Sequence, residues 1–301
     1  MAKLLPKTVI IGATGLLGKD FLGVHRSIHP DCVGTTRNPA RKDFAYLDLS
    51  SPDIAPLKLA ASGYQDALIL AGISKIATCQ DNKELSRKIN YTGTLDLIQQ
   101  LVKEGIKPIF FSSDYVFNGK SGNYDDEAIP DPLNEYGRHK AGIEVYMQQK
   151  CQGKYLVVRL SKIFSLEKGN GTIFDEMASM LSSGGTVWAA SDQIFSLTLI
   201  SDLVKVVTAL QRNNATGIYN ICSPEVWSRY DLALRMAECL GVAPAKVAKI
   251  SLDELGESFA RPKNTSMVTK RLDRDINYKF TPIIRCIRKI AENWMVPKLT
   301  R

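Results

Sequence analysis

The stretch TVIIGATGLLGKDFL, residues 8–22, decides the fold. An apolar, β-branched run leads into a GxxGxxG pattern, and an amphipathic segment follows. One glycine permits the tight strand-to-helix turn, another lets the backbone approach a pyrophosphate, and a third allows close packing. The helix N-terminus adds free N–H groups and the positive end of a dipole. The stretch therefore predicts nucleotide binding, with a purely structural turn as the alternative. The candidate contacts are Gly12, Thr14, Gly15, Leu16, Leu17 and Gly18.

Short apolar runs alternate with longer amphipathic segments along the first half of the chain. The runs lie at 8–13, 32–36, 66–72, 107–113 and 154–160, and helices are expected near 16–27, 82–104 and 135–150. Such runs fit strands that are buried on both faces. Strand–helix alternation implies right-handed crossovers and a parallel sheet. We therefore predict an α/β protein with a Rossmann-type doubly wound parallel sheet.

The pattern loosens beyond residue 161. Helices are expected near 172–182, 200–212, 229–240 and 283–294, with strands near 186–190 and 217–222. The absence of a low-complexity linker indicates a smaller substrate-binding domain that is interleaved with the first. We assign 1–165 and a returning segment at 184–222 to the dinucleotide-binding domain, and 166–183 and 223–301 to the substrate domain.

Composition excludes several classes of function. The 301 residues are 45% hydrophobic and 23% charged, which suits a globular protein with a substantial core. Six scattered cysteines without a Cys-x-x-Cys pair, and three histidines, suggest neither a metal site nor a disulfide framework. The net charge of +8 is not organised into a basic-aromatic module, so no nucleic-acid partner is expected. The N-terminal apolar run is too short for a signal or membrane segment, and we expect a cytoplasmic protein.

The end of the second strand bears on the choice of cofactor. An NAD enzyme usually offers an acidic residue there to the ribose 2′-hydroxyl, whereas this chain has Thr35, Thr36 and Arg37. A guanidinium suits a 2′-phosphate, so NADP(H) is favoured over NAD(H). Alternatively, Arg37 faces solvent in the following loop. Asp48 either accepts a hydrogen bond from the adenine amino group or caps its own loop. Further candidate cofactor contacts are Leu49, Ala71 and Gly72.

Two Tyr-x-x-x-Lys pairs lie in one expected helix, Tyr136 with Lys140 and Tyr146 with Lys150. Ligands of open parallel sheets bind at the carboxyl ends of the strands, where the following helices begin. Tyr136 starts its helix at that edge, whereas Tyr146 lies about 15 Å further along the axis. We therefore expect Tyr136 and Lys140 to belong to the site, together with Ser113 from the preceding strand and Asn90 from the preceding helix.

Four motifs carry a resemblance to a known family. They are GATGLLG (12–18), SSDYVFNG (112–119), DDEAIPDPLNEYGRHKAG (125–142) and ARPKNTSM (260–267). Over about residues 8–294 the chain resembles an extended short-chain dehydrogenase/reductase and is most similar to the dTDP-4-dehydrorhamnose reductase family. The resemblance implies NADP(H)-dependent reduction of a nucleotide-linked 4-keto-6-deoxy sugar. It is compatible with a homodimer.

The same resemblance assigns roles to individual residues. It implies that Tyr136 is the general acid and that Lys140 contacts the nicotinamide ribose and lowers the tyrosine pKa. Ser113 would hydrogen-bond the substrate carbonyl, and Asn90 would hold a water molecule in the proton relay. Arg261 matches a segment that lines the nucleotide-sugar pocket, with a surface role as the alternative. The implied substrate contacts are Ser113, Asp114, Tyr115, Tyr136 and Arg261.

Three departures from the family pattern affect the sugar side. Lys162 stands where the family usually has an aromatic residue. The segment 192–198 lacks the glycine and the proline of the family's motif, and the segment 71–81 differs in sequence from the family's loop at that place. Lys162 is either a new anion contact or a solvated side chain. Two other functions therefore stay open: a sugar-nucleotide epimerase or dehydratase on the same fold, and a non-catalytic NADP-binding subunit resembling the regulatory subunit of methionine adenosyltransferase.

Overall fold

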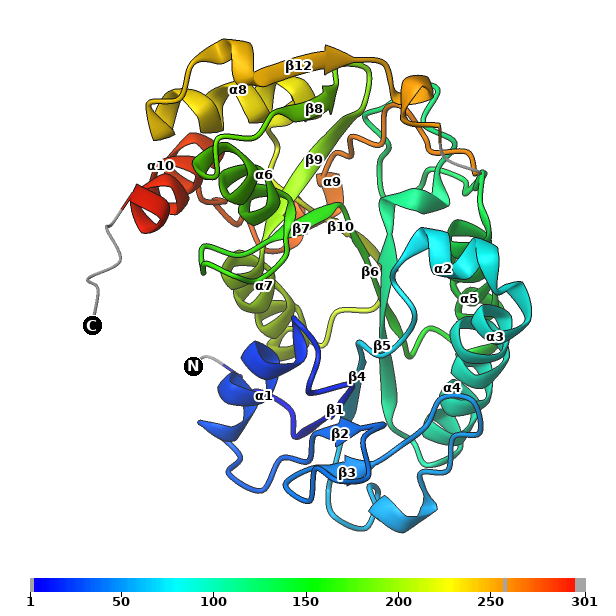
Figure 1. Cartoon of the computed structure of the whole chain (residues 1–301). Coiled ribbons are helices and arrows are strands. Elements are labelled where there is room, and N and C mark those ends of the chain that lie inside the picture. The colour runs from blue at the N-terminus through cyan, green and yellow to red at the C-terminus, as the bar shows by residue number, and fades with distance from the viewer. Residues whose placement is uncertain (1–2, 257–258, 296–301) are drawn as a thin grey trace. The chain divides into compact units, whose positions relative to one another are not determined.

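A computed structural model describes residues 3–256 and 259–295 (Figure 1). By its internal contacts the chain divides into two units. The first is formed by the chain up to Phe117, with Ile129–Arg159 and Val204–Tyr219, and the second by Asn118–Ala128, Leu160–Leu203 and the chain from Asn220 onward.

The sequence-based boundaries differ from this division in four places. Residues 160–165, 184–203 and 220–222 are expected in the dinucleotide-binding domain, and they group here with the second unit, as does the loop 118–128. This loop is hydrogen-bonded to the ARPKNTSM segment, where Asn264 N donates to Gly119 O at 3.0 Å and Tyr124 N donates to Ser266 O at 2.9 Å. The predicted domains also include 1–2, 257–258 and 296–301, which lie outside the described residues.

A five-stranded sheet forms the centre of the first unit, in the order β1-β4-β5-β6-β10. Thr8 of β1 is paired with Asp66 of β4, and Asp66 with Lys107 of β5, both in parallel register. The predicted fold class, a Rossmann-type parallel sheet, is confirmed. The five strands are β1 (Thr8–Ile11), β4 (Asp66–Ile69), β5 (Lys107–Ser113), β6 (Leu156–Leu160) and β10 (Gly217–Ile221).

A pair of two-residue strands extends the sheet beyond β1. Gly34 forms a parallel bridge with Ile10, directly before β2 (Thr35–Thr36). β2 in turn pairs in parallel with β3 (Ala45–Tyr46). The second apolar run of the sequence therefore leads to the edge of the sheet where a dinucleotide's adenosine half is bound in folds of this type.

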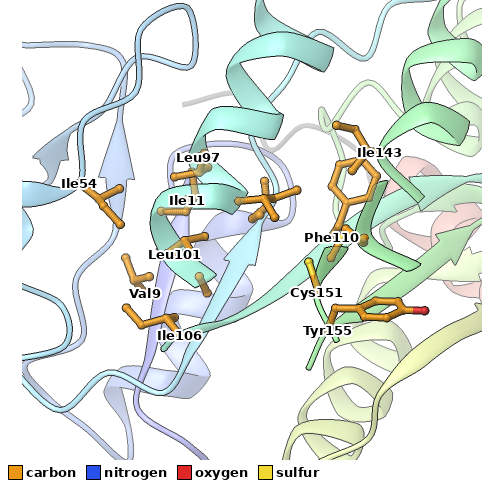
Figure 2. Packing of buried hydrophobic residues seen from close by; sticks show 14 of the residues in the cluster. Val9, Ile11, Ile54, Leu97, Leu101, Ile106, Phe110, Ile143, Cys151 and Tyr155 are labelled. Carbon is orange, nitrogen blue, oxygen red and sulfur yellow. The ribbon is translucent and has the colours of Figure 1, made fainter. Parts of the chain in front are cut away.

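Helices pack on both faces of this sheet, which explains why its strands are almost entirely buried. α4 (Thr94–Lys103) and α5 (Glu135–Lys150) contribute Leu97, Leu101 and Ile143 to a core that also contains Phe110 of β5 (Figure 2). On the other face Phe21 of α1 (Gly18–Arg26) packs edge-on against Phe111, with ring centroids 5.5 Å apart. A further helix, α7, comprises Ile200–Arg212.

The expected helix over 82–104 is present and contains a π-helical turn. It consists of α3 (Lys83–Arg87), a π-helical turn at Lys88–Gly93 and α4, preceded by α2 (Ile76–Asp81). A Cβ on Gly93 would lie 1.6 Å from Leu49 O, so the turn approaches a neighbouring loop more closely than any other residue allows. The helix was predicted, whereas its π-helical turn was not, because these contacts come from distant parts of the chain. π-Turns of this kind are often found at functional sites.

The second unit has its own core around α6 (Ile173–Ser182), α8 (Arg229–Leu240) and α10 (Ile283–Met295). Its strands form two small sheets, in the orders β11-β9-β7 and β12-β8. They are β7 (Lys162–Phe164), β8 (Val187–Ala190), β9 (Ile194–Leu199), β11 (Val226–Ser228) and β12 (Val247–Ile250).

Short helices complete the chain. They are α9 (Lys270–Asp275) and the 3₁₀ turns Ala55–Leu57, Asp114–Val116, Pro244–Lys246 and Leu252–Leu255. Among the described residues no helix is both long and apolar enough to cross a membrane.

Candidate active site

The glycine turn after β1 is built from close backbone approaches. Gly12 has φ of +89°, and a Cβ there would lie 2.8 Å from Ala71 N. A Cβ on Gly18 would lie 2.3 Å from Gly12 O, and Gly15 N donates to Gly12 O at 3.1 Å. Side chains at positions 12 and 18 would therefore break the turn. The bare backbone that results is the kind of surface to which a pyrophosphate can come close.

A cavity of about 270 Å³ lies beside this turn in the first unit. Eight of the predicted cofactor contacts line it: Gly12, Thr14, Gly15, Arg37, Asp48, Leu49, Ala71 and Gly72. Residues of the lining that were not predicted as contacts are Thr35, Thr36, Leu47, Leu70, Ile73 and Ile89. Of the other predicted contacts, Leu16 is exposed, Leu17 is half-buried and Gly18 is buried at the start of α1.

Three threonines in the wall of the cavity are held by hydrogen bonds. Thr35 Oγ1 accepts from Gly12 N at 3.2 Å, and the Thr14 and Thr36 hydroxyls lie 3.2 Å apart. The Arg37 side chain is exposed at the rim. Asp48 also lines the cavity, and its Oδ1 accepts from Ser50 N at 2.8 Å, so the loop-capping role is present.

The second cluster forms where β5 ends and α5 begins. Ser113 is the last residue of β5, and its hydroxyl donates to Asp114 Oδ1 at 2.9 Å and accepts from Tyr115 N at 3.2 Å. Tyr136 is the second residue of α5, and its ring packs edge-on against Tyr115 with centroids 6.2 Å apart. The Ser113 side chain also acts on the Tyr136 phenol, because it lowers the pKa of Tyr136 and so opposes the effect of burial. Ser113 and Tyr136 therefore meet at the carboxyl edge of the sheet.

The start of α5 is held tightly against the segment after β5. Asn134 caps the helix by accepting from Gly137 N at 3.0 Å. Position 137 must be glycine, because a Cβ would lie 2.2 Å from Tyr115 O. These contacts fix the start of α5 and therefore the position of Tyr136, its second residue.

Lys140 lies one helical turn beyond Tyr136. Its Nζ donates to Phe111 O at 2.6 Å and lies 5.7 Å from the centroid of the Tyr136 ring. Burial lowers the pKa of Lys140 to about 8. Burial raises the pKa of Tyr136 well above its usual value, so the lowering by Lys140 stays a prediction. A phenol of this kind stays protonated at neutral pH, which is the form that a proton donor requires.

Asn90 projects from the π-helical turn and holds the loop that follows β4. Its Oδ1 accepts from Ile73 N at 2.7 Å, and its Nδ2 donates to Ile73 O at 2.8 Å. Its Nδ2 also lies 3.5 Å from the thiol of Cys79, a fully buried residue of α2 that the sequence did not single out. The Asn90 side-chain amide is therefore hydrogen-bonded to protein atoms. Asn90 touches the loop at Ile73, and this loop lines the cavity.

The second Tyr-x-x-x-Lys pair has a different environment. Tyr146 is half-buried and packs against the hydrophobic core, and Lys150 is exposed at the last residue of α5. Both observations agree with the packing or surface role expected from their distance to the sheet edge.

Lys162, the altered motif at 192–198 and Arg261 belong to the second unit, whereas the other residues expected on the sugar side belong to the first. The Arg261 guanidinium lies 5.2 Å from the Phe259 ring centroid, and Lys162 Nζ lies 5.9 Å from the Phe195 ring centroid. Asp192, at the altered motif, accepts from Leu252 N at 2.6 Å and pairs with a lysine of the ARPKNTSM segment. In the described part of the chain no group of three His, Cys, Asp or Glu side chains is placed to hold a metal ion.

Together, the parallel sheet, the glycine turn after its first strand and the Tyr-x-x-x-Lys helix define an extended short-chain dehydrogenase/reductase fold. The model of the RmlD substrate binding domain family matches residues 6–293, and the chain belongs to that family. The predicted relationship to dTDP-4-dehydrorhamnose reductases is therefore confirmed.

Two curated relatives span most of the chain and have different names. A dTDP-4-keto-6-deoxy-D-glucose reductase of Streptomyces niveus is 25% identical over 260 residues, covering 85% of this chain and 86% of that protein. The methionine adenosyltransferase 2 subunit beta of Xenopus tropicalis is 26% identical over 307 residues, covering 98% and 90%.

Solved structures share the fold. The dTDP-4-dehydrorhamnose reductase of Yersinia enterocolitica superposes with a TM-score of 0.84 at 21% identity, covering 96% of this chain and 100% of that one. That of Bacillus anthracis, in complex with NADP, has a TM-score of 0.78 at 22% identity, covering 95% and 98%.

Proposed function

We propose that this protein is an NADP(H)-dependent reductase of a nucleotide-linked 4-keto-6-deoxy sugar. The observation that carries the proposal is the meeting of Ser113 and Tyr136, with Lys140 one turn behind, in the same unit as the glycine-lined cavity. The names of a relative, the Streptomyces niveus keto-sugar reductase, and of a structural neighbour, the Bacillus anthracis enzyme with NADP, support it.

The cavity in the first unit fits a dinucleotide phosphate. Gly12 and Gly18 allow the tight turn, and the exposed Gly15 between them leaves bare backbone, which suits a pyrophosphate. Thr35, Thr36 and Arg37 stand where an NAD enzyme has an acidic residue, and the exposed guanidinium offers two parallel donors to a 2′-phosphate. When bound, NADPH supplies the hydride for the reduction.

The chain's own residues supply the proton and the orientation. Tyr136 donates its phenolic proton to the carbonyl oxygen, so that C=O becomes CH–OH after hydride addition. Ser113 hydrogen-bonds the same oxygen and holds it beside Tyr136. The Lys140 ammonium, within 6 Å of the tyrosine ring, stabilises the phenolate left after proton transfer and contacts the cofactor ribose. Asn90 acts through the loop at Ile73, which lines the cavity.

The proposal is tested by incubating the protein with NADPH and a panel of nucleotide-linked 4-keto-6-deoxy sugars. Stoichiometric loss of NADPH absorbance with formation of the 4-hydroxy sugar is expected for at least one member. An epimerase or dehydratase on this fold would convert its substrate without net consumption of NADPH, which distinguishes it from the proposed reductase.

A second function is favoured by the methionine adenosyltransferase 2 subunit beta, which matches nearly the whole chain at 26% identity. A non-catalytic subunit of this kind would bind NADP(H) and a partner enzyme without reducing a sugar. Tight NADPH binding, no oxidation across the panel and co-purification with a methionine adenosyltransferase would support this function over the reductase.

A further inference from the structure

A buried hydrogen bond joins the strand that carries Ser113 to the helix that carries Tyr136. The Ser112 hydroxyl donates to Glu144 Oε1 at 2.5 Å, and both side chains are almost fully buried. Glu144 is the third residue in a row of i, i+4 and i+8 positions on α5, after Tyr136 and Lys140. Residues with this spacing share one helix face.

Arg159 of β6 holds the Glu144 carboxylate in place. Its Nη2 donates to Glu144 Oε2 at 2.7 Å, and its Nε lies 3.1 and 3.2 Å from the two carboxylate oxygens. Arg159 is only 1% exposed, and its guanidinium packs over the Phe117 ring at 5.0 Å. A buried carboxylate is tolerated when it is paired and hydrogen-bonded in this way, and the paired geometry leaves it little freedom.

Consecutive residues of β5 are thereby attached to consecutive turns of α5. Lys140 donates to Phe111 O at 2.6 Å, and Glu144 accepts from Ser112 four residues further along the helix. The next residue of the strand is Ser113. Both attachments resist sliding of α5 along β5, a movement that would separate Ser113 from Tyr136.

We propose that Glu144, oriented by Arg159, is a positioning residue that fixes Ser113 relative to Tyr136 and Lys140 through its hydrogen bond to Ser112. This inference rests on the proposed reductase function. The carboxylate has a second effect, because its charge raises the pKa of Lys140 and so opposes the lowering caused by burial.

Two variants distinguish the effect of the Ser112–Glu144 hydrogen bond from the effect of the Glu144 charge. Ser112→Ala removes the bond between β5 and α5 and keeps the ion pair. Its kcat is expected to fall by about 10- to 100-fold while KM for NADPH stays within about threefold, because misplacement by about 1 Å costs up to about 100-fold. The Lys140 titration should not change in this variant.

Glu144→Gln/Arg159→Met keeps an acceptor for Ser112 and removes both charges together, which avoids leaving one buried charge unpaired. The Lys140 pKa, read from the pH dependence of its acetylation by mass spectrometry, is expected to fall below the wild-type value of about 8. The alkaline limb of kcat/KM should move in the same direction.

A matched control removes another buried ion pair from the same sheet. Asp66 and Lys107 are the first residues of β4 and β5, and their charged groups lie 3.6 Å apart. Ser113 is at the other end of β5. Asp66→Asn/Lys107→Met should leave both kcat and the Lys140 titration unchanged. Equal losses in this control and in the test variants would overturn the proposal, as would wild-type kcat in a folded Ser112→Ala protein.

The Lys140 titration also separates failure of this inference from failure of the proposed function. If the wild-type protein oxidises no NADPH with any sugar, the reductase function fails, and the titration decides only the effect of the Glu144 charge on Lys140. The positioning role is then decided by crystal structures of the wild-type and Ser112→Ala proteins, and an unchanged placement of Ser113 beside Tyr136 would overturn it.

Discussion

Alanine at position 137 tests how the start of α5 places Tyr136. The added Cβ would lie 2.2 Å from Tyr115 O and 2.8 Å from Pro132 Cβ. Carbon and carbonyl oxygen normally approach to about 3.3 Å, so the helix start must retreat by about 1 Å. Tyr136 precedes this position directly and moves with it. A displacement of about 1 Å at a reacting group costs about 100-fold in rate, or about 2.7 kcal/mol of activation free energy.

The assay is kcat for NADPH oxidation with a sugar that the wild-type protein reduces, together with the NADPH Kd and the unfolding temperature. Gly23→Ala is the control, because nothing lies within 4 Å of its added Cβ in α1. It should keep full activity and gain up to about 1 kcal/mol of stability from helix propensity. A folded Gly137→Ala protein that binds NADPH and retains wild-type kcat would refute the argument.

Four further outcomes are expected. Tyr136→Phe should lower kcat by on the order of 1000-fold with little change in NADPH Kd, whereas Tyr146→Phe should do little; equal losses in both would contradict the assignment. Arg37→Ala should weaken NADPH binding by about 10- to 100-fold and spare NADH, as measured by fluorescence titration; equal wild-type Kd values for the two would contradict it. Burial lowers the Lys140 pKa to about 8, so kcat/KM should fall above that pH as the ammonium is lost, and a flat profile to high pH would argue against its role. Burial also lowers the His25 pKa, so the unfolded chain binds more protons than the folded one below about pH 6.5. The free energy of unfolding should therefore fall as the pH drops below that value, by at most about 1.4 kcal/mol per pH unit. Urea unfolding of His25→Gln should show a shallower dependence of this free energy on pH.

The first unit was largely predictable because its signals are local. Each strand is a short apolar run, and the Gly12 turn combines a strand, a glycine pattern and a helix in one continuous stretch. The position of Tyr136 followed from its place at a helix start, since parallel strands end where the next helices begin. Spacing alone did not distinguish it from Tyr146, which has the same motif.

Features set by distant contacts were not predictable. The π-helical turn in the helix over 82–104 depends on Asn90 bonding to Ile73 and on Gly93 meeting Leu49 O. The raised pKa of Tyr136 was not predictable, because it comes mainly from burial, and burial is a property of the whole fold. No sequence signal distinguished the Cys79 thiol from other buried cysteines.

The second unit was harder to predict because its strands are short. β7 is only three residues long. It is recognised as a strand by its pairing with β9, in which Lys162 lies opposite Leu197, and not by its own sequence. Strands of this length carry too few residues for a period-2 pattern to be recognised.

The most direct test of the central claim is transfer of deuterium from NADPH labelled at nicotinamide C4 to the keto sugar. The account predicts that the wild-type protein forms a 4-hydroxy sugar carrying one deuterium per NADP⁺ released, and that Tyr136→Phe, with its cofactor site intact, forms almost none. Tight NADPH binding with no labelled product from any nucleotide-linked 4-keto-6-deoxy sugar would contradict the assignment of this site as a reductase.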